Sequence, residues 1–581
     1  MLKRLRPLFP YLAKYKKGLL LGSVCVLGTN GIRILFPQVI RFAINGLNSG
    51  VTHEKLVKYA LLLVLVSALT GVFQFLTRWI VIGISRDIEF DLRNDLFRHL
   101  EKLPYSYYQR NRVGDIMARA TNDLNAVRML LGPAIMYSAN TIVFTAGALV
   151  FMTRISPGLT LWAFLPLPIV SIIVQYFGAR IHERFERIQA MFSEISARAQ
   201  ENFSGARIVR AFSQEKAEID QFENANQEYI RRSLKLVRLM GMLWPTLETM
   251  LGLAVVLVLW LGGRQVLRGE MNVGDFVAFN TYMVQLTWPI IALGWVINIF
   301  QRGTASMGRI NEILIAQPGI KDTEEAKRLR ITEVRGALEF RDLSFAFDGT
   351  RVLKNITLSV PEGTSLAIVG PTGSGKTTLV NLIPRIYDAP RGSVLLDGRP
   401  IQDFPLETLR RNIGFVPQET FLFSDTVREN IAFGVEEATD EQIHDAAEGA
   451  SIAKDIESFP EEYRTVVGER GITLSGGQKQ RTAIARALIR NPKILVLDDA
   501  LSSVDTYTEE KILDHLYDVM KGRTTIFISH RVSTVRNADQ IAVLHDGEIV
   551  ELGHHDELIE KNGHYADLYN KQLLEEELAE V

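Results

Sequence analysis

The segment 370–378 reads Gly-Pro-Thr-Gly-Ser-Gly-Lys-Thr-Thr, and its residue types suit the binding of phosphate groups. Its glycines let backbone N–H groups approach phosphate oxygens without a Cβ atom in the way. The apolar run 366–369 before it predicts a buried strand, and the residues after it predict a helix. We expect Lys376 to reach the β- and γ-phosphates of ATP and the Thr377 hydroxyl to bind Mg²⁺. The predicted nucleotide-binding residues of this turn are Gly370, Pro371, Thr372, Gly373, Ser374, Gly375, Lys376, Thr377 and Thr378.

A second apolar run, 494–498, predicts another buried strand, and it ends in the carboxylate of Asp498. A carboxylate at this place is expected to hold Mg²⁺, usually through water. An acidic residue after an apolar strand is often an ordinary loop residue. The segment 474–478, Leu-Ser-Gly-Gly-Gln, precedes this strand and favours the metal interpretation.

The first 300 residues contain six apolar stretches, each close to or above the ~20 residues that a helix needs to cross a bilayer. They are roughly 18–44, 57–84, 132–153, 157–178, 242–268 and 276–300. Lys and Arg are abundant in the leading segment 2–17 and in the connections 85–131 and 179–241, which predicts that these parts and both termini face the cytoplasm. The long connections are expected to be helical, and 2–17 is expected to form an amphipathic elbow on the inner face of the membrane.

Composition excludes several other classes of protein. The net charge of −1 gives no general attraction to nucleic acid, so none is expected as a partner. The single cysteine, Cys25, rules out a disulfide framework and a thiolate zinc site. The basic N-terminus has no small-residue cleavage site after a short apolar core, so we expect no cleaved signal peptide.

From residue 336 onward, short Val/Ile/Leu runs alternate with helical segments, which predicts a mostly parallel sheet covered by helices. The expected strands are 338–340, 365–370, 413–416, 494–498, 525–529 and 541–544. The predicted fold class is a membrane all-α six-helix domain plus an α/β P-loop ATPase domain. We place the transmembrane domain at 1–320, a polar linker at 321–335 and the second domain at 336–581.

The phosphate turn, Asp498 and the Leu-Ser-Gly-Gly-Gln motif together resemble the ATP-binding cassette (ABC) family. Residues 336–570 are similar to its ATPase domain, and 1–320 resemble the six-helix membrane domain of its exporter-type members. The resemblance implies a dimer. It also implies that Phe347 stacks on adenine, where Tyr is more usual, and that Gln418 senses the γ-phosphate and Mg²⁺.

Further roles follow from the same resemblance. It implies that the signature residues bind the γ-phosphate of ATP held by a partner chain; these are Ser475, Gly476, Gly477 and Gln478. Residues 502–505 would cross the dimer seam, and His530 would hydrogen-bond the γ-phosphate. Short helices near 107–115 and 205–213 would dock on the ATPase domains and couple them to the membrane.

Asp499 departs from the family pattern, which has Glu at this position to position and polarise the attacking water. Asp is one methylene shorter, so its carboxylate lies about 1 Å further from that water, and such a displacement can cost about a hundredfold in rate. In some exporters an Asp-bearing chain with an intact signature pairs with a Glu-bearing chain whose signature is altered. This chain resembles the first kind, which favours a heterodimer. A homodimer that tolerates Asp as a weak base is the alternative.

The resemblance implies ATP-driven export of hydrophobic or amphipathic small molecules, drugs or lipids, from the cell inner (plasma) membrane. Export of lipid or peptide by a homodimer, and an ATP-gated channel or regulatory membrane ATPase that does not pump, are the alternatives. Two charges fall inside expected spans, Arg33 and Glu248. Each is expected to line a transport cavity, to form a structural ion pair or to snorkel toward the membrane surface.

Overall fold

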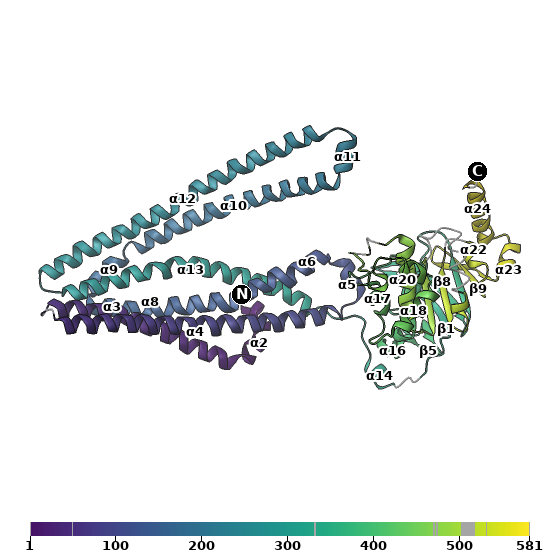
Figure 1. Cartoon of the computed structure of the whole chain (residues 1–581), viewed down its shortest axis with the longest axis horizontal. Helices are drawn as coiled ribbons and strands as arrows, with labels where there is room; N and C mark the ends of the chain where they lie inside the picture. The colour runs from purple at the N-terminus through teal and green to yellow at the C-terminus, as the bar shows by residue number, and fades with distance from the viewer. Residues whose placement is uncertain are drawn as a thin grey trace. The chain divides into compact units, whose positions relative to one another are not determined.

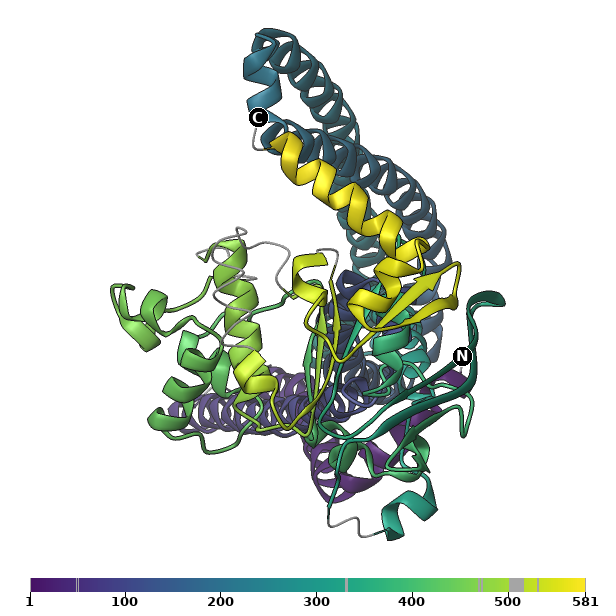
Figure 2. The same cartoon turned by 90° about the vertical axis from the view of Figure 1, so that its right-hand side faces the viewer.

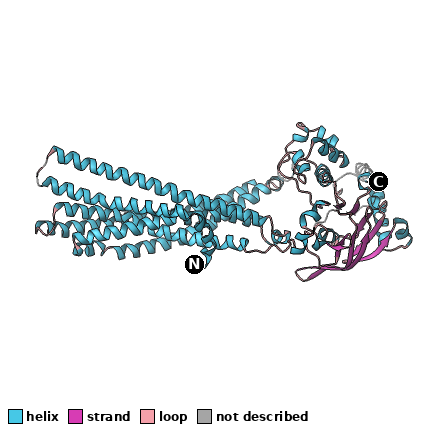
Figure 3. Ribbon diagram, turned by 90° about the horizontal axis from the view of Figure 1, so that it is seen from below, coloured by secondary structure: helices cyan, strands magenta, loops and turns pink. Residues whose placement is uncertain are grey.

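The computed structural model describes residues 2–48, 50, 52–329, 333–468, 471, 474–500, 517–529 and 532–579. The chain divides into two compact units. The helical unit comprises Met1–Leu100 and Gly114–Ile315, and the sheet unit comprises Glu101–Val113 and Ala316–Val581. Among the described residues, strands occur only in the sheet unit (Figure 3).

The helical unit is built from long helices that run side by side (Figure 1). The N-terminal segment forms the short helices α1 (Leu2–Leu5) and α2 (Phe9–Lys14), as expected for an elbow. The long helices are α3 (Lys16–Asn48), α4 (His53–Leu100), α8 (Ile135–Ile155), α10 (Leu167–Ser204), α12 (Glu215–Leu267) and α13 (Val273–Leu314). Helix α3 packs along α4, α8 and α13, whereas α10 packs mainly along α12. The predicted helical connections are therefore confirmed as extensions of the spans.

Five helical segments of the described residues are long and apolar enough to cross a membrane: Lys16–Asn48, His53–Leu100, Val113–Ile155, Glu215–Leu267 and Val273–Leu314. The predicted run 157–178 differs, because it is divided between α9 (Pro157–Phe164) and the start of α10. Pro166 and Pro168 lie at this division and lack backbone N–H donors, so the helical hydrogen-bond ladder is not continuous there. Beyond the division α10 becomes polar.

The sheet unit contains a six-stranded sheet in the order β10-β9-β3-β8-β7-β6. Its strands are drawn as arrows in Figure 2. Its parallel strands are β3 (Ser365–Val369), β6 (Ile413–Val416), β7 (Ile494–Asp498), β8 (Thr524–Ile528) and β9 (Gln540–His545). Strand β10 (Glu548–Gly553) pairs antiparallel to β9 at one edge. The prediction of a mostly parallel sheet is confirmed, and each strand lies within one residue of its expected position.

A second, antiparallel sheet was not predicted from the sequence. It has the order β2-β1-β4-β5. Its strands are β1 (Leu338–Phe347), β2 (Thr350–Val360), β4 (Val394–Leu396) and β5 (Arg399–Pro400). Only the first three residues of β1 were expected to be extended. Residues of β2 alternate between buried and exposed positions, with polar side chains on the open face, so no continuous apolar run marks this strand.

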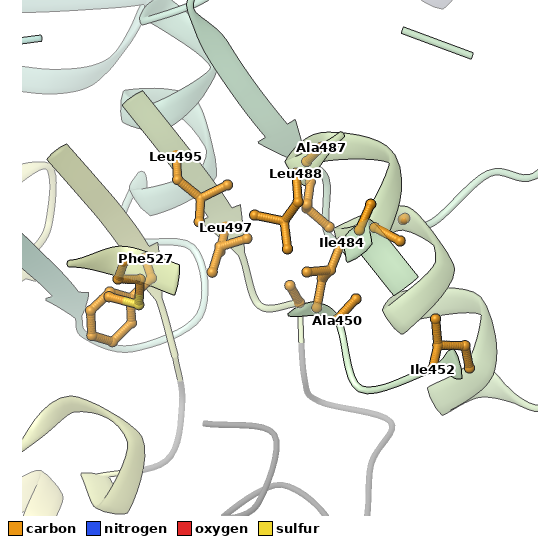
Figure 4. Close-up of a cluster of buried hydrophobic side chains, with 14 of the residues drawn as sticks. Ala450, Ile452, Ile484, Ala487, Leu488, Leu495, Leu497 and Phe527 are labelled. Carbon is orange, nitrogen blue, oxygen red and sulfur yellow. The ribbon is translucent and has the colours of Figure 1, made fainter. Parts of the chain in front are cut away.

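Alternation along the central strands divides the sheet unit into two hydrophobic cores. On β3, Leu366 and Ile368 belong to the core shared with β1 and β2, whereas Ala367 and Val369 belong to the core on the other face. The core that contains Ala367 and Val369 also includes residues of α20 (Gly476–Leu488). Figure 4 shows this contact, in which Leu495 and Leu497 of β7 face Ile484 and Leu488 of α20. Burial on both faces explains why these strands appear as continuous apolar runs.

Two Asp-Gly turns provide a test of how tightly the sheet unit is packed. Gly547, between β9 and β10, has φ +84°, and a Cβ atom there would lie 2.3 Å from the carbonyl oxygen of Val352. Gly398, between β4 and β5, has φ +77° with nothing within 4 Å of such an atom. We expect Gly398→Ala to cost about 1 kcal/mol through the left-handed backbone alone. Gly547→Ala adds a clash with backbone and is expected to cost ~3 kcal/mol.

The measurement is the midpoint of thermal unfolding of the full-length protein in lipid nanodiscs, with the two variants compared side by side. Gly547→Ala should show the clearly larger decrease. Equal decreases in the two variants would contradict the close approach of the β9–β10 turn to β2.

Candidate nucleotide site

The phosphate turn and the predicted Mg²⁺ residues lie along one rim of the six-stranded sheet. Strands β3, β7 and β8 are parallel, and their register places Ile368 and Asp498 each opposite Ile528. The turn at 370–375 follows β3 directly, so it leaves the sheet at the same rim where β7 ends in Asp498. The carboxyl edge of a parallel sheet therefore brings together segments that are more than a hundred residues apart in the sequence.

The turn after β3 has a backbone that only glycine accommodates. Gly370, Gly373 and Gly375 have φ values of +148°, +86° and +103°. A Cβ atom on Gly370 would lie 2.0 Å from the carbonyl oxygen of Leu544 in β9. The positive φ values explain the spacing of glycines in the turn, and at Gly370 the close approach to Leu544 leaves no room for a side chain.

Lys376 opens helix α15 (Lys376–Leu382) and folds back over the turn. Its ammonium group donates hydrogen bonds to the carbonyl oxygens of Gly370 and Pro371, at 2.8 and 2.9 Å. The side chain is buried, and burial lowers its pKa. The Ser374 hydroxyl is also buried and has no hydrogen-bond partner among the described residues. A curled-back ammonium and an unpaired hydroxyl in a glycine turn fit the phosphate groups of a nucleotide.

Asp498 and Thr377 lie together, as the sequence predicts for a metal site. The Thr377 hydroxyl donates to Oδ1 of Asp498 at 3.1 Å. Burial raises the pKa of Asp498 to about 6, with a further increase from Asp499 and opposing decreases from the Thr377 hydrogen bond and the Lys376 charge. Such a carboxylate suits a hard divalent cation, which would offset the cost of keeping its charge buried.

Asp499, the residue expected to act on water, lies next to these groups. Its charge raises the pKa of Lys376, against the larger effect of burial, and its backbone N–H donates to the carbonyl oxygen of Ile528 at 3.1 Å. Its φ is +49°, a left-handed conformation that Asp adopts more readily than most residues. The structure thus places Asp498, which is buried, and Asp499, which is half-buried, at one end of β7 beside the lysine.

Phe347 ends strand β1 and belongs to an aromatic cluster. Its ring meets Phe345 at 5.0 Å and Tyr387 at 4.9 Å between centroids, both edge to face. Tyr387 was not singled out from the sequence. It follows α15 by five residues, and no motif or apolar pattern around it in the sequence draws attention to it.

Tyr387 also connects this cluster to α5 (Tyr105–Arg110), which belongs to the sheet unit. Tyr105 packs against Tyr387 with ring centroids 6.2 Å apart, and Gln109 hydrogen-bonds the Tyr387 hydroxyl. Arg110 forms an ion pair with Asp348. A short helix in the connection 85–131 therefore contacts the surface beside Phe347. The other expected docking helix is α11 (Ala206–Ala211), which lies in the helical unit.

The signature segment forms the start of α20. Ser475 is its N-cap, and its hydroxyl accepts a hydrogen bond from the Gln478 N–H, while the Gln478 side chain accepts from the Ser475 N–H. Gln478 also donates to Asp455 at 3.1 Å. Gly476 and Gly477 form the first turn of the helix. The capping box holds the exposed N-terminus of α20 in a fixed form.

The remaining predicted residues are Gln418, His530 and the seam residues 502–505. Gln418 follows β6 on the same rim and is exposed. His530, and residues 502–505 of the expected dimer seam, lie outside the described residues.

Similarity to known proteins identifies the family to which the chain belongs. Residues 19–290 match the model of the ABC transporter transmembrane region, and residues 353–502 match the ABC transporter model. A probable multidrug resistance ABC transporter ATP-binding/permease protein of Bacillus subtilis is 37% identical over 95% of both chains. The chain belongs to the ABC transporter family.

Other relatives extend this result over the whole length. An ATP-dependent lipid A-core flippase of Syntrophus aciditrophicus is 37% identical over 100% of this chain and 95% of its own. The structure of a bacterial Atm1-family ABC exporter with ATP bound matches with a TM-score of 0.79 at 29% identity, over 96% of this chain and 99% of the exporter. This ABC transporter therefore has the exporter fold, in which a membrane domain and an ATPase domain couple ATP hydrolysis to transport.

The raised pKa of Asp498 predicts how the stability of this ABC transporter depends on pH. Because the folded-state pKa of about 6 lies above the ordinary 3.8, the protonated carboxyl stabilises the fold. This contribution to the free energy of unfolding is fully present below about pH 4 and is lost as the pH rises through 6. The loss amounts to ~3 kcal/mol. Asp498→Asn has no such charge, so it should unfold at a higher temperature than the original protein at pH 8 without nucleotide or Mg²⁺.

The measurement is thermal unfolding of both proteins at pH 5 and pH 8, without and with Mg²⁺ and ATP. The advantage of Asp498→Asn should shrink at pH 5. With Mg²⁺ and ATP present, the original protein should gain more than the variant. An advantage of equal size at both pH values would show that the carboxylate is not under strain from burial.

Proposed function

We propose that this ABC transporter is one half of a dimeric exporter that moves hydrophobic or amphipathic small molecules out through the cell inner membrane. The observation that carries the proposal is the rim of the parallel sheet, where Lys376, Thr377, Asp498 and Asp499 meet. The activities for which relatives are named, multidrug resistance and lipid A-core flipping, support a drug or a lipid as cargo.

The site residues take the following proposed roles. The turn 370–378 binds the phosphates of ATP, with Lys376 turning from its carbonyl partners toward them. Thr377, Asp498 and Gln418 hold Mg²⁺, which offsets the phosphate charge. Phe347 stacks on adenine. The signature residues 475–478 complete the ATP site of the partner chain, and His530 supports the γ-phosphate.

We propose that the partner is a different half-transporter. Asp499 shortens the reach of the residue that should polarise water, while the signature segment is intact and correctly capped. A chain of this kind contributes more to its partner's ATP site than to its own. A homodimer exporting lipid or peptide remains the competing arrangement, and an ATP-gated channel or a regulatory ATPase is a competing activity.

Lys376→Met tests whether transport depends on this site. The variant removes the ammonium group that faces the phosphates, so ATPase activity and uphill transport should both fall to background. The assay uses sealed vesicles containing the purified transporter and measures movement of a lipophilic dye against its gradient. Unchanged uphill movement would disprove ATP-driven export, and ATP hydrolysis without any uphill movement would favour the channel or regulatory alternative.

Asp499→Glu tests the pairing. We expect the chain purified alone to hydrolyse ATP slowly, and the added methylene to raise its turnover by between ten and about a hundredfold by restoring the reach of the carboxylate. Asp499→Asn is the matched control and should stay at or below the original rate. Rapid turnover by the unaltered chain that Asp499→Asn abolishes would remove the reason to expect a heterodimer.

A further inference from the structure

A cavity of about 540 Å³ lies among α3, α4, α8 and α13 in the helical unit. It lies between segments that are expected to span the bilayer. Its lining is unusually polar for a cavity inside a membrane domain. Amide and hydroxyl side chains contribute to it from several helices, among them Asn30, Gln74, Asn140 and Gln285. Polar groups at this depth are costly unless they serve a ligand or each other.

Two arginines line this cavity, Arg33 from α3 and Arg78 from α4. The residues lining the cavity include no Asp or Glu. Within the described residues, neither guanidinium forms an ion pair with an acid, and Arg33 instead lies over the ring of Phe144 at 4.7 Å. Two positive charges that share one cavity without a carboxylate favour a negatively charged occupant.

Three other cations of the helical unit have acidic partners. Arg41, two turns after Arg33 on α3, is paired with Asp275. Lys14 is paired with Asp91, and Arg309 donates to Asp123 at 2.8 Å. Arg33 and Arg78 differ from these three cations, because no acidic residue among the described residues pairs with either of them.

The cavity also presents an unused acceptor and an apolar wall. The side-chain oxygen of Gln285 is buried and has no hydrogen-bond donor among the described residues. A hydroxyl or N–H on an occupant would satisfy it. Phe36, Phe144 and Trp288 also line the cavity, so a chain or ring could lie along them.

We propose that this cavity binds the head group of an amphipathic anion. A phosphate or carboxylate lies against Arg33 and Arg78, a neighbouring hydroxyl or N–H donates to Gln285, and the apolar part follows the aromatic wall. This narrows the cargo of the proposed exporter from hydrophobic or amphipathic molecules to anionic amphiphiles, and it rests on that proposed function.

One other source of negative charge must be tested. Glu248 on α12 is exposed and has no acidic or basic partner among the described residues. In the assembled dimer, Glu248 from either chain could neutralise the two arginines in place of a ligand. The binding experiment with Glu248→Gln distinguishes binding of an anion from neutralisation by this carboxylate.

The test measures binding of matched amphiphiles to the full-length dimer in phosphatidylcholine nanodiscs by microscale thermophoresis. Lauroyl lysophosphatidic acid carries a phosphate and a free hydroxyl, and lauroyl lysophosphatidylcholine has the same chain with its phosphate capped by choline. We expect the first to bind at least tenfold more tightly. Arg33→Gln and Arg78→Gln should each weaken its binding about tenfold and change the choline lipid less than twofold.

Arg33→Lys keeps the charge and should retain most of the preference, which a purely structural role for the guanidinium would not predict. Arg154→Gln is the matched control, because Arg154 lies on α8 against Phe151 and does not line the cavity. Glycerol 3-phosphate, the head group without a chain, should not displace the lysophosphatidic acid at comparable concentration.

Equal affinity for the two lipids, or no effect of either glutamine variant, would overturn the proposal. So would displacement by glycerol 3-phosphate, which would indicate an ion site without a role for the aromatic wall. A preference that emerges only in Glu248→Gln would also overturn it. Binding is measured without ATP, so the result is independent of the Lys376→Met transport assay.

Discussion

The approach of the chain at Gly370 to the carbonyl of Leu544 is the constraint on which the nucleotide site depends. A Cβ atom would lie 2.0 Å from that oxygen, so no side chain fits where β3 leaves the sheet beside β9. Because the turn starts there, Lys376 begins its helix above the rim and Thr377 reaches Asp498 at the end of β7. The register of the parallel strands then fixes all these groups without long loops.

Much of this arrangement can be predicted from sequence because parallel strands are buried on both faces. Strands such as β3 and β7 carry unbroken apolar runs, and each ends at a residue with recognisable chemistry, Gly370 or Asp498. The antiparallel sheet escapes prediction, since half of the side chains of β2 face solvent and its pattern is mixed with polar residues. Tyr387 could not be predicted for another reason. Its role arises from contacts with Phe347 and Tyr105, which no local sequence pattern encodes.

In the helical unit, too, some features can be predicted from the sequence and others cannot. Span length and hydropathy reveal its long helices, yet the run 157–178 looks continuous by composition and is divided at Pro166 and Pro168. Arg33 could be recognised as costly, but its partner could not be predicted. The structure answers this through Phe144 and a shared cavity with Arg78, which are properties of helix packing and not of spacing along α3.

The membership of residues 101–113 in the sheet unit has a consequence for how this chain can be divided. A soluble fragment beginning at residue 316 would lack α5, so Tyr387 would lose the Tyr105 ring and the Gln109 hydrogen bond, and Asp348 would lose Arg110. The newly uncovered aromatic face would adjoin Phe347. Such a fragment would be an incomplete folding unit, and its behaviour in isolation would differ from that of the same residues in the whole chain.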